Sequence, residues 1–139
     1  MVRRRALGMF LGLVALPLGA REKWSLIPGS DAIVCGRVER FWRVPWFDGW
    51  HVWGTIEVER VLKGTVRQGD RLSYRFLCAH CDPQEMWDLH PDFYKPSIWY
   101  IRKDRDGKWS SASDSTDMGQ RPMQDLPGLI EVLRKYYPR

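Results

Sequence analysis

The sequence predicts a mainly β protein, in which a small five-stranded barrel is followed by a C-terminal α-helix and preceded by a signal peptide. Residues 31–76 alternate apolar and polar side chains with a period of two, which is typical of strands. Gly36 and Gly54 fall within two of these strands, where a barrel bends and backbones approach closely. Closing a short sheet into a barrel hides its edges. We expect a signal peptide at 1–20, a linker at 21–30 and one domain at 31–139.

The first twenty residues have the three parts of an export signal. Arg3, Arg4 and Arg5 precede an apolar run over 6–18, and small residues end the segment at Gly19 and Ala20. The run is shorter than the ~20 residues that a membrane-spanning helix needs. We therefore expect cleavage after Ala20, no stable membrane span after cleavage, and a mature protein exported to the periplasm or the cell exterior.

The charge of the chain depends on this signal. Three of the 22 basic residues lie in it, whereas all 17 acidic residues follow it, so the remaining 19 basic residues leave a net charge of +2. Nucleic-acid binding usually needs a strongly basic face. Export also removes the protein from most nucleic acid, and we expect no nucleic-acid partner.

Each strand is indicated by its own alternation. The first strand is predicted over 31–41, and its early residues are apolar on both sides, so we expect burial on both faces there. An aromatic-rich hairpin connection with a turn at Asp48 and Gly49 leads to a second strand over 51–62. Further strands are predicted at 71–76, 97–101 and 108–112, with a long excursion over 78–96 and a loop over 113–123.

The last element is a helix over 125–136. Leu126, Leu129, Ile130 and Leu133 recur at helical spacing, and Asp125 stands where an N-cap is expected.

Three segments together resemble a known family. Residues 31–38, residues 56–64 with the run V-E-R-V-L-K-G, and residues 69–72 are similar to bacterial exported domains related to the tissue inhibitors of metalloproteinases and the netrin-type modules. The resemblance implies an OB-like barrel. Those inhibitors chelate the zinc of their target through an N-terminal cysteine, but the expected mature N-terminus here is Arg21. We therefore do not expect inhibition by that mechanism.

The three cysteines allow three different kinds of chemistry. In an exported chain we expect a structural disulfide that joins Cys35 to Cys78 or Cys81. Two alternatives remain open, thiol-redox chemistry by the Cys78-x-x-Cys81 pair and a metal site. The candidate metal ligands are Cys78, His80, Cys81 and His90.

Five aromatic side chains gather around the first hairpin: Trp42, Trp46, Phe47, Trp50 and Trp53. They form either a ligand-binding surface or a cover over the barrel mouth, since tryptophan rings serve both purposes. No nucleophile with an activating base stands in a recognisable frame, and no cofactor motif is present. The sequence therefore predicts a non-enzymatic binding module without a cofactor, for a protein or a surface ligand, with the thiol or metal protein as the alternative.

Overall fold

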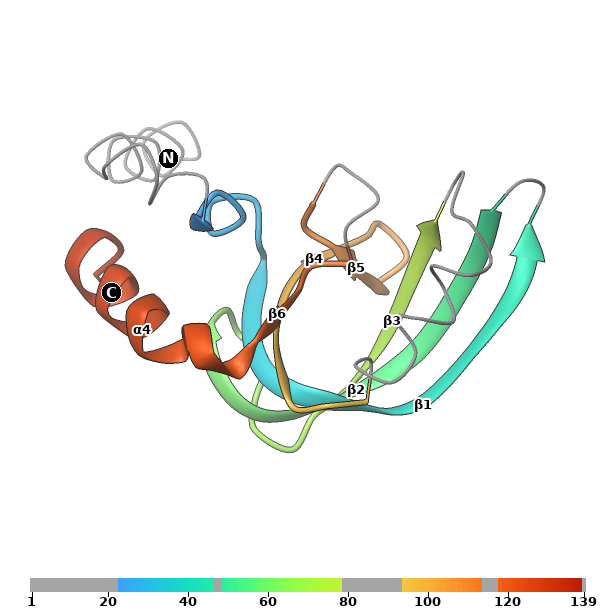
Figure 1. Ribbon diagram of the computed structural model, residues 1–139, viewed down its shortest axis with the longest axis horizontal. Coiled ribbons are helices and arrows are strands. Elements are labelled where there is room, and N and C mark those ends of the chain that lie inside the picture. The colour runs from blue at the N-terminus through green and yellow to red at the C-terminus, as the bar shows by residue number, and fades with distance from the viewer. Residues whose placement is uncertain (1–22, 47–48, 79–93, 114–117, 139) are drawn as a thin grey trace.

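The computed structural model describes residues 23–46, 49–78, 94–113 and 118–138. It confirms a mainly β protein with a closed five-stranded barrel and a C-terminal helix (Figure 1). The elements, in chain order, are β1 (Ala32–Trp46), β2 (Gly49–Lys63), β3 (Arg71–Cys78), β4 (Ser97–Lys103), β5 (Trp109–Ser111), β6 (Gln120–Pro122), a 3₁₀ turn (Met123–Asp125) and α4 (Leu126–Tyr136).

The barrel closes in the order β1-β2-β3-β5-β4, with β4 returning to pair with β1. Every pairing is antiparallel except that of β3 with β5. The short strand β6 pairs with the first half of β4, at Ser97–Trp99 of that strand. Only part of β1 and β2 belongs to the closed barrel, and the outer halves of both strands extend beyond it (Figure 1).

Two separate cores explain the double-sided burial predicted at the start of β1. Ala32, Val34 and Val38 face the barrel interior, in a cluster that contains Trp99 of β4. The intervening Ile33 and Cys35 belong to a second cluster outside the barrel, under α4. A strand exposes successive side chains on opposite faces, so β1 is covered on both sides at this end.

The described part of the expected linker, residues 23–30, packs onto this second core. Residues 24–29 form a turn that buries Trp24 and Ile27 completely or nearly so. Lys63, at the end of β2, donates hydrogen bonds of 2.9 Å and 2.7 Å to the carbonyls of Ile27 and Ser30. Burial lowers the pKa of Lys63, against a smaller opposing effect of the Asp31 carboxylate. The turn is therefore anchored by both apolar packing and polar contacts.

The C-terminal helix begins as predicted, but its N-cap works differently. Asp125 occupies the N-cap position and makes no capping hydrogen bond with its side chain. Its carboxylate instead lies 3.5 Å from Nζ of Lys23, which ties the helix to the N-terminal turn. Among the described residues, none of the helices is sufficiently long and apolar to cross a membrane.

The first four strands are longer than their sequence patterns indicated, whereas β5 is shorter than the strand expected over 108–112. The aromatic arms expected to form a loop connection continue the β1–β2 ladder as far as the pair Trp46↔Gly49, because aromatic and β-branched residues favour paired strands. The loop expected over 113–123 contains β6. Most of the long excursion expected over 78–96 lies outside the described residues.

Candidate binding surface

The outer halves of β1, β2 and β3 form a three-stranded sheet whose side chains line up in rows. The register places Trp42 beside Trp53 on β2, and Trp53 beside Arg75 on β3. The next row contains Val44, His51 and Leu77. Cross-strand partners lie on the same face of a sheet. We call the outward surface of these two rows the aromatic face: Trp42, Val44, His51, Trp53 and Leu77.

Three aromatic rings form a continuous strip on this face. Trp42 and Trp53 stack with ring centroids 6.3 Å apart and an interplanar angle of 24°. His51 stacks on Trp53 at 4.1 Å, also at 24°. The opposite face of the same strands is buried, for example at Val52 and Phe76. The two rows are thus directed away from the core.

The aromatic face is open to solvent. Trp42 is 54% exposed, Leu77 is 48% exposed and Val44 is 43% exposed. Single exposed apolar residues are ordinary on protein surfaces, but a contiguous apolar patch marks an interaction site more often. Here the three lie in adjacent rows of one sheet, so they form one patch.

Arg75 forms the charged border of this patch. Its guanidinium lies 3.2 Å from the carboxylate of Asp104 and 2.9 Å from that of Asp106, both in the turn between β4 and β5. The hydroxyl of Ser110 donates to the same Asp104 carboxylate at 3.1 Å. These contacts fix the β4–β5 turn against β3, beside Trp53.

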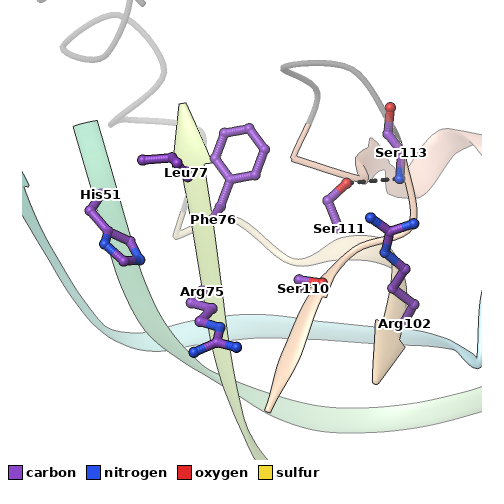
Figure 2. Close-up of a pocket in the computed structure, with 8 residues that line it drawn as sticks. All are labelled: His51, Arg75, Phe76, Leu77, Arg102, Ser110, Ser111 and Ser113. Atoms are coloured by element: carbon purple, nitrogen blue, oxygen red, sulfur yellow. Dashed lines mark hydrogen bonds between the residues drawn. The ribbon is translucent and has the colours of Figure 1, made fainter. Parts of the chain in front are cut away.

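A groove adjoins the aromatic face where β3 and β5 separate. Among the described residues these strands share one ladder pair, Tyr74↔Trp109, beyond which the barrel wall opens. The resulting cavity measures about 330 Å³. It is lined by the side chains that Figure 2 shows: His51, Arg75, Phe76, Leu77, Arg102, Ser110, Ser111 and Ser113.

His51 connects the groove with the aromatic strip, since it lines the first and stacks within the second. Partial burial and, to a smaller extent, the positive charge of Arg75 lower the pKa of His51 below its usual value of 6.5. The imidazole is therefore neutral at neutral pH. It offers hydrogen bonding and stacking there, without adding a charge.

The structure brings together two of the five aromatic residues that the sequence singled out, Trp42 and Trp53. The backbones of Trp46 and Trp50 lie at the end of the β1–β2 hairpin, but their side chains, and all of Phe47, lie outside the described residues. Val44, Leu77 and Arg75 were not predicted to belong to a surface. A sequence signal was present for Val44, which lies two residues after Trp42 on the same strand, but not for Arg75 and Leu77, which join the surface through the β2–β3 register.

The predicted disulfide from Cys35 is wrong, because Cys35 is a free, buried thiol. It pairs with Arg60 on β2, whereas Cys78 pairs with Trp50 of the same strand. At about 3.3 Å per residue, this separates the two cysteines by roughly 33 Å of curved strand. A disulfide needs Cα atoms within about 7 Å. Burial raises the pKa of Cys35, with Glu59 adding to the rise and Arg60 opposing it.

The thiol and metal alternatives rest on residues that the structure does not describe. His80, Cys81 and His90 lie outside the described residues, as does the side chain of Cys78. Within the described part of the chain, no group of three or more His, Cys, Asp or Glu side chains is placed to hold a metal ion.

Comparison with protein-family models, with curated proteins and with solved structures gives no match for this chain.

Proposed function

We propose that this protein is a non-enzymatic binding module, exported from the cytoplasm, whose ligand docks on the aromatic face. The observation that carries the proposal is the stacked pair of Trp42 and Trp53, of which Trp42 remains 54% exposed. Because about half of the Trp42 side chain is already covered, hiding the rest from water would bring about half of the 1.5–3 kcal/mol that full burial of a large apolar side chain brings, or roughly 1 kcal/mol. A ligand that covers the ring recovers this free energy.

The rigidity of the surface supports the same proposal. The rings stand on three paired strands, and the adjacent turn is fixed by the contacts of Arg75 with Asp104 and Asp106. A ligand therefore meets side chains that are already ordered, which lowers the entropic cost of binding. Aromatic residues and arginine are also the side chains that contribute most at protein interfaces.

Selection from a random peptide library and a glycan array, both with the purified protein, tests the proposal. Dissociation constants of the selected ligands are then measured with Trp42→Ser and with a control, Lys135→Ser, on the exposed surface of α4. We expect Trp42→Ser to weaken binding by about tenfold or more, and the control to leave it unchanged. Ligands that bind both variants equally would place the binding surface elsewhere.

A further inference from the structure

A second cavity, of about 660 Å³, lies at one mouth of the barrel. Its floor consists of three apolar side chains of the barrel core, Val66, Leu72 and Trp109. The rest of its lining comes from residues at the ends of the surrounding strands: Asp31, Gly64, Thr65, Asp70 and Lys103. Small-molecule sites favour the mouths of β-barrels and combine an apolar wall with a few polar groups. The cavity shares no lining residue with the aromatic face or with the groove beside it.

Main-chain contacts fix the acidic side chains of this mouth. Asp31 accepts a hydrogen bond of 2.8 Å from the main-chain amide of Lys103. Asp70 accepts one of 2.8 Å from the main-chain amide of Arg67. Both bonds use Oδ2, and neither Oδ1 atom has a hydrogen-bond partner among the described residues. Each carboxylate is therefore held in place with one oxygen available to a ligand, which lowers the entropic cost of binding.

Lys103 places a positive charge in the same cavity. It is the cross-strand partner of Trp109, and its ammonium lies 5.7 Å from the centroid of that indole ring. Within the described part of the chain its ammonium forms no ion pair, and neither do Asp31 and Asp70. The carboxylate of Asp31 also lies near Lys63, whose charged form it favours. Two negative charges are thus balanced by two positive charges around the cavity.

This mixture of groups decides which ligand chemistry fits. A carboxylate only accepts hydrogen bonds, and an ammonium only donates them. A cationic ligand would be repelled by Lys103, and an anionic ligand would be repelled by Asp31 and Asp70. A hydroxyl both donates and accepts, so hydroxyls satisfy groups of either kind. Hydroxyls also cost less to remove from water than the two charges of a zwitterion.

We propose that this cavity binds a neutral saccharide, whose hydroxyls donate to Asp31 and Asp70 and accept from Lys103, while its C–H surface covers the apolar floor. The volume of about 660 Å³ lies within the range of about 300–1,000 Å³ that is typical of small-molecule sites. The cavity is separate from the aromatic face, so this inference does not depend on the proposed function.

Titration of the ¹⁵N-labelled protein with small probes, followed by NMR, tests the inference. The neutral probes are the methyl glycosides of glucose, galactose, mannose and N-acetylglucosamine. Cyclohexylamine, cyclohexanecarboxylate and leucine are the cationic, anionic and zwitterionic comparisons. We expect at least one glycoside to cause saturable shifts at the amides of Gly64 and Thr65 and at the indole N–H of Trp109. The three charged probes should bind more weakly than this glycoside.

Two variants remove hydrogen-bonding groups of opposite kind. Asp70→Asn keeps an oxygen for the turn's main-chain amide, and Lys103→Met keeps an apolar stem of similar length. We expect each to weaken binding of the glycoside by about tenfold. Glu131→Gln and Lys135→Met on the exposed surface of α4 are the matched controls and should leave binding unchanged. Lys135 suits this purpose because its ammonium also lies over an aromatic ring, that of Tyr136.

Unchanged amide signals in the second core will show that the variants fold. The inference is overturned if no glycoside causes saturable shifts, if a charged probe binds as tightly as the glycosides, or if either cavity variant binds the glycoside like the wild type. Tighter binding to Lys103→Met would also overturn it, because the ammonium would then exclude the ligand. A glycoside that loses affinity in Trp42→Ser but not in Asp70→Asn would overturn this inference and support the proposed function.

Discussion

The hydroxyl of Tyr74 on β3 donates a hydrogen bond of 2.6 Å to the main-chain carbonyl of Met118. Tyr74 is only 1% exposed, and its ring meets that of Trp99 edge-on at 5.5 Å. It is also the residue at which β3 pairs with Trp109 of β5. The bond therefore ties the chain that follows β5 to the point where the barrel closes.

Replacing Tyr74 with Phe should destabilise the protein by about 1–3 kcal/mol, because the buried carbonyl of Met118 loses its donor. Urea unfolding measures this change in the free energy of unfolding. Tyr136→Phe provides the control, since Tyr136 is only partly buried, and its effect should stay within about 0.5 kcal/mol. Equal effects of the two substitutions would contradict the role of the bond.

For Tyr137 we expect the opposite effect of a Tyr→Phe substitution on stability. Its hydroxyl oxygen is buried without a hydrogen-bond partner among the described residues, and burial raises the pKa of the phenol. Removing a buried, unsatisfied hydroxyl removes a desolvation cost. We therefore expect Tyr137→Phe to raise the free energy of unfolding by up to about 1 kcal/mol, measured in the same urea titrations. A clear loss of stability would show that the hydroxyl has a partner.

The fold was predictable from the sequence because apolar and polar side chains alternate along its strands. At the start of the first strand the side chains on both sides of this alternation are apolar. The alternation at Ala32, Ile33, Val34 and Cys35 correctly indicated burial on both faces. The burial of Trp24 was not predicted, because a turn that packs on a distant strand leaves no periodic pattern in the sequence.

The candidate site was less predictable. The aromatic residues around the first hairpin were visible, but their pairing with Arg75 and Leu77 depends on the β2–β3 register, which a single sequence does not specify. The groove depends on where β3 and β5 stop pairing, and this is a property of the closed barrel. The wrong disulfide has a similar cause, since counting cysteines gives no distance between them.

Gly36 should be one of the least replaceable positions in the barrel wall. A Cβ there would collide with the carbonyl oxygen of Glu57 on the neighbouring strand. The carbonyl of Gly36 also accepts a hydrogen bond of 3.1 Å from the indole of Trp99. We expect Gly36→Ala to cost about 1–3 kcal/mol or more, because β1 and β2 must move apart. Gly29→Ala is the control, since a Cβ there meets only Ala112 at 3.8 Å.

Cys35 should be inert in the native protein. It is 3% exposed, and burial raises the pKa of its thiol, so little thiolate is present and access is blocked. In a Cys78→Ser, Cys81→Ser double variant, mass spectrometry should find Cys35 unlabelled by N-ethylmaleimide under native conditions. The same reagent should label it fully in urea. Rapid native labelling would show that the second core opens at this position.

Glu57 should make the stability of the protein depend on pH. A hydrogen bond with Glu39, and the negative charge of that residue, raise the pKa of Glu57 above its ordinary 4.5. Between 4.5 and this raised value the folded state binds more protons than the unfolded state. The free energy of unfolding therefore falls as pH rises through that window.

Glu57→Gln removes the titrating group together with its repulsion of Glu39. The variant should gain stability relative to the wild type as pH rises from roughly 4 to roughly 7, in urea titrations at both values. Glu131→Gln, on the exposed surface of α4, is the matched control and should follow the wild type throughout. If the difference between Glu57→Gln and the wild type is the same at both pH values, the two carboxyl groups do not share a proton in the folded state.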